Sequence, residues 1–253
     1  MSPVHLFKYR EINNWTARII THNELYFAKP QELNDPWDCA SRVSFEGATP
    51  AQIRDLVHVA MKEALCNLVL STAKFEEVVE RHYREALTDP DGFLRDAERG
   101  LRDSIQVGKG VYCLSEVANE AQMWSYYAKG HSGICIDMSL PEILTSARAV
   151  RYMGHLPRFN FFDLPLEQLA DKVLFTKHNN WSYEHEWRII QREFPPGAHH
   201  FKYPLVKRVI FGAKTRPPDV KLVLGWLKDA RLDVPLYQAE LDPCQPVVQI
   251  RPI

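Results

Sequence analysis

The chain has 253 residues, of which 45% are hydrophobic and 25% are charged, and this composition is typical of a globular protein rather than a disordered one. Its net charge of −1 at pH 7 does not by itself indicate a polyanionic partner. No apolar run is long enough to span a membrane, and the N-terminal stretch MSPVHLFKYR does not resemble a signal peptide. The five scattered cysteines predict a reducing, cytoplasmic environment rather than a disulfide framework.

The first forty residues combine strand, helix and turn patterns. Residues 5–10, HLFKYR, alternate apolar and polar side chains as a strand does, and residues 11–20 have the apolar spacing of a helix. A second short strand is predicted over 24–30 and ends at a proline. The following segment, 31–39, reads QELNDPWDC, and its Asn, Asp and Pro residues predict a turn.

Residues 49–107 have a different character, because three successive stretches show helical spacing of apolar residues. Thr49 and Asp91 each stand beside a proline, at positions where helices commonly begin. We interpret this segment as a helical insertion within a single domain that covers 1–253. Its histidines and acidic residues carry no signal of a functional site.

Strand patterns return after the insertion. Strands are predicted in 108–116, 131–139, 149–153, 186–194, 199–213, 235–241 and 246–253, and helices in 119–130, 164–175 and 217–230. Because strands both precede and follow the helical block, the sequence predicts an α+β fold rather than a repeating βαβ pattern.

The sequence lacks the motifs of several common binding sites and catalytic mechanisms. There is no CxxC or HExxH that would predict a metal site, no GxxxxGK[ST] or GxGxxG that would hold phosphates, and no GxSxG nucleophile motif. A metal-dependent nuclease stays open as an alternative, with Asp137, Glu184 and Glu186 as converging acids and Arg188 in the place of a lysine. Residues 148–231 contain 15 Lys or Arg against 8 Asp or Glu, and such a basic surface would suit a phosphate-bearing ligand or simply be solvated.

The stretch WSYEHEWRII, residues 181–190, places two glutamates one residue apart among aromatic side chains. In a strand, Glu184 and Glu186 would point to the same side and repel each other unless a positive group lies there. Trp181, Tyr183 and Trp187 would form flat walls around this acid pair, which suit a planar ring and especially a cationic one.

Four stretches are rich in aromatic, charged and small polar residues: FKYR (7–10), NDPWD (34–38), SEVANEAQMWSYYAKGHSGICI (115–136) and KHNNWSYEHEWR (177–188). Together and in this order they resemble a mostly bacterial family, domain-of-unknown-function family 2971, over nearly the whole chain. The family name implies little biochemistry.

A second resemblance implies a mechanism. The order of an aromatic and basic first strand, a helix, a short strand, a serine-ending strand and an E-x-E strand is similar to the ADP-ribosyltransferase fold, in which a split mixed or antiparallel sheet holds NAD. The resemblance implies that Arg10 or Lys8 holds NAD, that Ser115 supports the ribose, that Glu186 is the catalytic acid and that Glu184 orients the acceptor. The middle strand departs from the pattern, since it reads CLSE rather than serine-threonine-serine. Further candidates for NAD contacts lie in the same motifs: Tyr9, Trp124, Tyr127, His131 and Tyr183.

The resemblance implies transfer of ADP-ribose from NAD to a protein or nucleic-acid acceptor, without a metal, and by analogy with related transferases a role as a bacterial toxin or phage-defence effector. Cleavage of the nicotinamide–ribose bond builds positive charge on the sugar, which one carboxylate stabilises while a second deprotonates the nucleophile. Simpler interpretations are that Glu186 pairs with Arg188 or Arg192, that Arg10 forms a salt bridge, or that the chain binds a nucleotide or nucleic acid without chemistry. Trp124, Tyr127 and Trp181 would then be core residues and His131 a structural histidine.

Overall fold

The computed structural model describes residues 5–39, 42–44, 46–106, 108–139, 146–155, 158–245 and 247–253. The chain divides into two compact units, one formed by Met1–Cys39, Gln106–His155 and Phe175–Ile253 and the other by Ala40–Ile105 and Leu156–Leu174. Each unit combines helices and strands, so the α+β class is confirmed.

The first unit is built on a mixed eight-stranded sheet with the order β14-β13-β12-β5-β1-β4-β10-β6. Neighbouring strands are antiparallel except β12 and β13, which are parallel. The strands are β1 (Phe7–Arg10), β4 (Gly110–Ser115), β5 (Ile134–Met138), β6 (Arg148–Ala149), β10 (Glu186–Gln191), β12 (Val206–Phe211), β13 (Leu236–Leu241) and β14 (Val248–Pro252).

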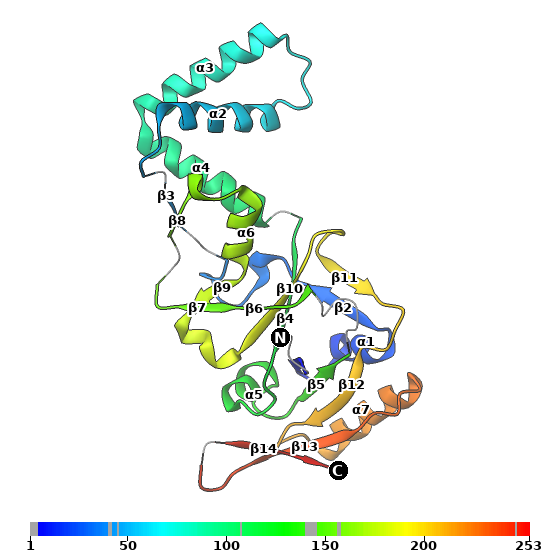
Figure 1. The fold of residues 1–253 in the computed structure, drawn as a ribbon. Coiled ribbons are helices and arrows are strands. Elements are labelled where there is room, and N and C mark those ends of the chain that lie inside the picture. Colours follow the sequence, from blue (N-terminus) through cyan, green and yellow to red (C-terminus); the bar gives the residue numbers. More distant parts are fainter. Residues whose placement is uncertain are drawn as a thin grey trace. The chain divides into compact units, whose positions relative to one another are not determined.

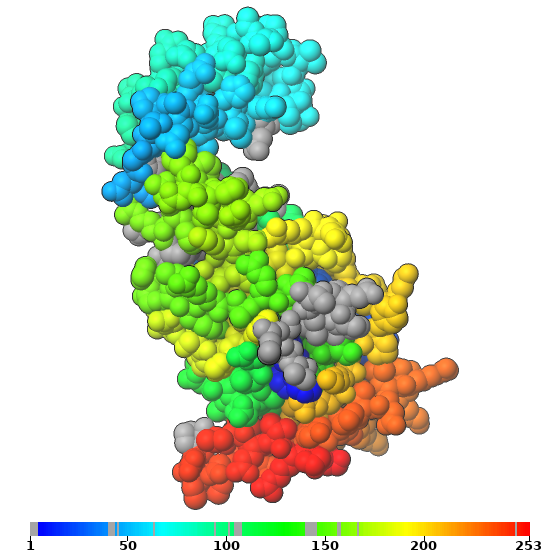
Figure 2. Space-filling model, in the orientation of Figure 1, coloured from blue at the N-terminus to red at the C-terminus, as the bar shows by residue number. Residues whose placement is uncertain are grey.

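Both faces of this sheet are covered, which explains why β5 is buried along its whole length. Ile134 and Ile136 face a core that includes residues of α1 (Asn14–Thr21) and α7 (Pro217–Asp229). Cys135, which points to the other side as strand periodicity requires, packs with Trp124 of α5 (Ala121–Tyr127). The space-filling view shows α7 in orange and the last strands in red side by side on the surface (Figure 2).

The sheet opens between β1 and β4, near the middle of the strand order. Figure 1 shows β4 beside β10 and β5 beside β12. β1 is paired with β5 through all four of its residues, and β4 is paired with β10 through all six of its residues. Between β1 and β4, however, a single pair, Phe7 and Ser115, is in register. The two halves of the sheet are therefore joined at one point, and the side chains that follow Phe7 on β1 border the opening.

Shorter elements surround this opening within the first unit. β2 (Glu24–Phe27) pairs with β11 (Gly197–His200), and β7 (Arg151–Met153) pairs with β9 (Thr176–His178). Two short 3₁₀ helices, η1 (Pro30–Glu32) and η4 (Asn179–Glu184), precede the NDPWD segment and strand β10 respectively.

The second unit contains the helices predicted over 49–107. They are α2 (Pro50–Ala64), α3 (Thr72–Thr88) and α4 (Pro90–Gln106), while Val107 lies outside the described residues. Ser71 caps α3 by accepting a hydrogen bond from the Lys74 amide. The unit also includes α6 (Leu166–Leu174), the 3₁₀ helix η3 (Phe161–Asp163) and the parallel pair of β3 (Arg42–Ser44) with β8 (Arg158–Asn160).

Three local predictions are wrong in detail. The segment 199–213 is not one strand, since β11 ends at His200 and pairs with β2, while β12 begins at Val206 and pairs with β5. The segment 149–153 is not one strand, since Val150 separates β6 from β7. Glu184 and Glu186 do not share a strand either: Glu184 ends η4, His185 has the left-handed φ of 45°, and β10 begins at Glu186. The convergence of the two carboxylates therefore depends on this turn and not on strand alternation.

Candidate active site

A cavity of ≈ 260 Å³ lies at the opening between β1 and β4. Its lining includes residues of β1, β4, β9, β10, η4, α5 and the NDPWD segment, so parts of the chain that are far apart in sequence meet there. Seven of the ten predicted site residues line it: Lys8, Tyr9, Arg10, Ser115, Tyr127, Glu184 and Glu186. The volume is slightly below the usual range for small-molecule sites, about 300–1,000 Å³.

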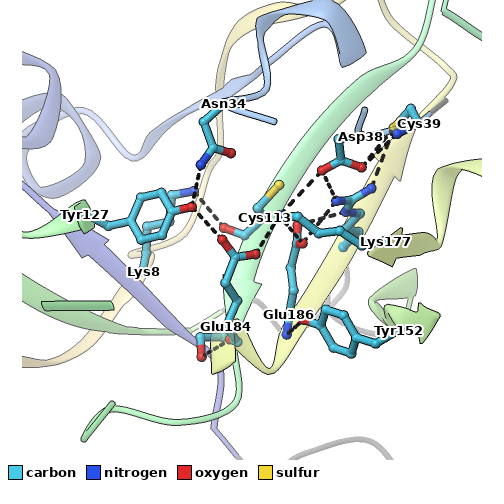
Figure 3. A network of polar contacts seen from close by, with 12 residues as sticks. Lys8, Asn34, Asp38, Cys39, Cys113, Tyr127, Tyr152, Lys177, Glu184 and Glu186 are labelled. Carbon is cyan, nitrogen blue, oxygen red and sulfur yellow. Dashed lines mark hydrogen bonds and ion pairs between the residues drawn. The ribbon is translucent and has the colours of Figure 1, made fainter. Parts of the chain in front are cut away.

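The acid pair forms part of a buried ionic network (Figure 3). The Lys177 ammonium lies 2.6 Å from a Glu184 carboxylate oxygen, 3.2 Å from Glu186 and 3.5 Å from Asp38. Arg188 donates hydrogen bonds of 2.8 and 3.0 Å to the two Glu186 oxygens and one of 2.5 Å to Asp38. All five side chains are almost completely removed from solvent. Three carboxylates thus share two cations, so one negative charge is left over if all three are ionised.

Backbone contacts fix the positions of the two glutamates. The Ser115 hydroxyl donates to the Glu184 carbonyl at 2.7 Å, and the Glu186 amide donates to the Tyr152 hydroxyl at 2.8 Å. Glu186 is also opposite Ser115 in the β4–β10 pairing. Ser115 is fully buried and therefore holds the acid-bearing turn in place next to the cavity.

The two carboxyl groups have opposite pKa shifts. Burial, followed by repulsion from Glu186, raises the pKa of Glu184 above its usual value, although Lys177 and Tyr127 oppose the rise. Burial also acts to raise the pKa of Glu186, but Arg188 and Lys177 outweigh it, so the pKa of this group is lowered. Neighbouring carboxyls with separated pKa values can take different roles, one as a permanent anion and the other as a proton carrier.

Glu184 is connected toward the protein surface through Tyr127. The Tyr127 hydroxyl donates a short hydrogen bond to Glu184 and accepts one of 2.7 Å from the exposed Asn34 side chain. Burial is the largest cause of a strongly raised pKa of Tyr127, and the Glu184 charge adds to it. Tyr127 therefore stays protonated and remains a hydrogen-bond donor to Glu184.

The basic residues of β1 face the same cavity. Lys8 donates a hydrogen bond of 2.6 Å to the Cys113 carbonyl, across the opening, and its ammonium lies 4.6 Å from the centre of the Tyr112 ring. Burial is the main cause that lowers the pKa of Lys8 to about 8. Arg10 makes no ion pair with any residue that the structure describes. A partly buried cation without a counterion is suited to an anionic ligand.

Three predicted site residues do not line the cavity. Trp124 is completely buried, and its indole donates to the Ala118 carbonyl at 2.8 Å. His131 follows α5 and lies 3.1 Å from the Ser125 hydroxyl, while Tyr183 packs near Tyr126 and Trp181. Tyr9 does line the cavity, but its hydroxyl donates to the Val117 carbonyl at 2.9 Å.

The acids of the nuclease alternative do not converge. Asp137 is bound by His5 at 2.7 Å and Arg208 at 2.8 Å and does not line the cavity with Glu184 and Glu186. Over the part of the chain that the structure describes, no group of three or more His, Cys, Asp or Glu has the geometry of a metal site.

Lys177 and Asp38 were not predicted as members of the site. Arg188 was expected only as a possible partner of Glu186 or as the cation of a nuclease, and its pairing with Glu186 is confirmed. All three lie within motifs that the sequence singles out, KHNNWSYEHEWR and NDPWD, so the density of charged and aromatic residues was the available signal. Their complete burial and mutual contacts depend on the fold and cannot be read from spacing.

Searches against protein-family models, curated proteins and solved structures found no match to this chain. Among the described residues, none of the helices has the length and apolar character needed to cross a membrane.

Proposed function

We propose that the chain is an NAD-dependent transferase of the ADP-ribosyltransferase type. One observation carries the proposal: a single cavity, located where the sheet splits between β1 and β4, is lined both by the basic residues Lys8 and Arg10 and by the acid pair Glu184 and Glu186. NAD combines a pyrophosphate, which requires cations, with a ribose that becomes positively charged when nicotinamide leaves.

Each of the two carboxylates would have its own role in the reaction. Nicotinamide departs with the electron pair of its bond to the ribose, and the acceptor nucleophile bonds to the same carbon and releases a proton. Glu186 stays ionised because Arg188 and Lys177 lower its pKa, so its negative charge can stabilise the developing oxocarbenium ion. Glu184 has a raised pKa, so it is the better group to take the proton of the nucleophile.

The buried position of the acids suits transfer rather than hydrolysis. Glu184 and Glu186 are 3% and 4% exposed, and a site that excludes bulk water favours a bound acceptor over solvent. The acceptor would be a protein or nucleic acid, and Arg10 and Lys8 would hold the pyrophosphate. We include in the proposal membership of domain-of-unknown-function family 2971, a cytoplasmic location and, by analogy only, a role as a toxin or phage-defence effector.

One observation favours a second candidate, a module that binds a nucleotide without chemistry. Both oxygens of Glu186 are engaged by Arg188, and one of them also lies 3.2 Å from Lys177. A carboxylate with this many partners can be a structural element, which positions the cavity wall and never contacts a ribose.

Incubation with NAD labelled in the nicotinamide or in the adenine ring separates these functions. The transferase releases labelled nicotinamide in the presence of a chelator and moves adenine label to an acceptor in a bacterial lysate. Glu184→Gln should slow release by about 10²–10⁴-fold, as expected for loss of a general base. Glu240→Gln, an exposed acid on β13 that pairs with Arg251, is the matched control and should leave release unchanged.

Each remaining outcome contradicts the transferase. NAD binding without nicotinamide release supports the binding module. Nucleic-acid cleavage that stops when a chelator is added supports the nuclease.

A further inference from the structure

A second cavity of ≈ 400 Å³ adjoins the basic end of β1. It shares the lining residues Lys8, Arg10, Leu33 and Cys113 with the first cavity, so the two spaces adjoin at the same cations. Its volume is within the range of small-molecule sites, about 300–1,000 Å³. None of its other lining residues belongs to the predicted site.

One residue that lines this cavity, Tyr112, has a buried hydroxyl without a partner. Tyr112 is 3% exposed, and its hydroxyl makes no hydrogen bond to any residue that the structure describes. The Arg10 guanidinium is near enough to oppose the rise in the Tyr112 pKa that burial causes. Buried polar atoms are nearly always hydrogen-bonded, so the orphaned hydroxyl of this lining residue is a donor that a bound ligand can engage.

Two cations accompany this hydroxyl. Neither Arg10 nor Lys8 forms an ion pair with a described residue, and Lys8 uses one donor on the Cys113 carbonyl. The acid of the same cavity, Glu24, is already neutralised, since it accepts hydrogen bonds from Arg18 and lies 3.1 Å from His200. The free donors at this wall therefore suit an anionic group, and a phosphate can accept hydrogen bonds from all three.

Aromatic rings line the rest of the cavity. Trp15 on α1 is 63% exposed and Tyr26 on β2 is 49% exposed, although both are large side chains that usually pack against other residues. Ile19 and Val111 add apolar surface. Exposed aromatic faces beside a cationic wall are the arrangement by which proteins stack a nucleobase while they hold its phosphate.

We propose that the second cavity binds a nucleoside phosphate, with its phosphate on Arg10, Lys8 and the Tyr112 hydroxyl and its base against Trp15 and Tyr26. This site shares Arg10 and Lys8 with the proposed NAD site, so its ligand and NAD would compete for these two cations, but binding of a nucleoside monophosphate requires neither nicotinamide nor bond cleavage. Tyr112, Trp15 and Tyr26 thereby acquire a role that neither the sequence motifs nor the acid pair assigns to them.

Isothermal titration with AMP, adenosine and inorganic phosphate tests this site on the full chain. AMP should bind more tightly than either fragment, because it alone engages both walls. Tyr112→Phe should weaken AMP about tenfold, the effect of a hydrogen bond to a charged group, and leave adenosine unchanged. Trp15→Ala should weaken AMP and adenosine alike, by about tenfold. Tyr203→Phe, an exposed tyrosine outside both cavities, is the matched control.

The stability of Tyr112→Phe provides a second readout. Removal of an unpaired hydroxyl should keep or raise the melting temperature of the unliganded protein while AMP affinity falls, so weaker binding cannot be attributed to misfolding. Absence of AMP binding to the native chain overturns the proposal, as does equal AMP binding by native protein, Tyr112→Phe and Trp15→Ala. Because AMP contains no nicotinamide, these results do not depend on whether NAD is cleaved.

Discussion

The Lys177 ammonium lies 2.6 Å from the Glu184 carboxylate, and both side chains are less than 5% exposed. The same ammonium also approaches Glu186, so one buried cation lies between two acids with opposite pKa shifts. Glu184 shares this cation while Glu186 has Arg188 as an additional partner. Glu186 has two cationic partners and Glu184 has one. Glu186 therefore stays ionised, while Glu184 can bind and release a proton.

The ion pairs of Glu186 predict a large loss of stability when this acid is neutralised. Glu186→Gln weakens the buried hydrogen bonds from Arg188 and Lys177, although Arg188 keeps Asp38 and Lys177 keeps Glu184 as partners, and loss of hydrogen bonds between charged groups costs about 1.5–3 kcal/mol of unfolding free energy. Urea denaturation measures the loss. Glu240→Gln, which removes an exposed pair with Arg251, should cost no more than about 1 kcal/mol. Similar losses for the two variants would contradict the burial of the network.

The stability difference between the native protein and Glu186→Gln should depend on pH. The pKa of Glu186 is lower in the folded protein than its usual value of 4.5, so its contribution to stability is present above pH 4.5. The contribution disappears as the pH falls through the folded pKa. The stability difference between native protein and Glu186→Gln should therefore shrink when denaturation is repeated at increasingly acidic pH below 4.5, and a difference that grows on acidification would contradict the shift.

Tyr127 should control the protonation of Glu184. Its hydroxyl donates to the carboxylate and thereby favours the charged form, so Tyr127→Phe should raise the pKa of Glu184 further. A ¹³C NMR titration of the glutamate carboxyl groups measures this directly and needs no substrate. Tyr126→Phe, which changes the exposed neighbour on the same helix, is the control and should leave the pKa of Glu184 unchanged. A downward shift in Tyr127→Phe would show that the hydroxyl does not stabilise the carboxylate.

Much of the layout follows from local sequence patterns. The apolar alternation of FKYR and the nearly continuous apolar run ICIDM place β1 and β5 correctly, and helical spacing over 49–107 corresponds to α2, α3 and α4. Periodicity reports which face of an element is apolar, and this is why strands and helices are found by it. Arg10, Lys8, Ser115 and the two glutamates were expected to meet, and all five line one cavity.

The chemistry inside the site could not be read in the same way. The turn at His185, with a φ of 45°, changes the directions of Glu184 and Glu186, and nothing in the E-x-E spacing indicates it. The burial of Lys177 and Arg188 beside Asp38 depends on contacts across up to 150 positions of sequence. A charged residue normally indicates a solvated surface, so local patterns point away from a fully buried ionic network.

Lys8 makes binding at the second cavity sensitive to pH. Its pKa is lowered from 10.5 to about 8, so the ammonium that would contact phosphate loses its proton as the pH rises through 8. AMP affinity should therefore fall between about pH 7 and pH 9, beyond the small change caused by phosphate ionisation. Titration calorimetry at several pH values measures the fall, and Lys8→Arg, whose charge persists, should abolish it. A native affinity that stays constant over this range would exclude Lys8 from the phosphate site.

Lys8 also affects stability with a defined sign. Since its pKa is lower in the folded state, the unfolded chain binds more protons between pH 8 and 10.5, and the Lys8 contribution to stability rises with pH over this interval. Denaturation of the native protein and of Lys8→Met at pH 7.5 and pH 10 tests this. The native protein should gain stability relative to Lys8→Met at the higher pH, and a relative loss would contradict the lowered pKa.

Calorimetric titration of NAD into the native chain, Arg10→Ala and Arg251→Ala tests most directly whether the opening between β1 and β4 holds a dinucleotide. Arg10 has no ion pair in the described structure and lines both cavities, whereas Arg251 is an exposed residue paired with Glu240 on the outer strands. The account predicts that NAD binds the native chain and Arg251→Ala equally and binds Arg10→Ala at least about tenfold more weakly, as for loss of charged hydrogen bonds to phosphate. Failure of NAD to bind the native chain, or equal binding by all three proteins, would contradict it.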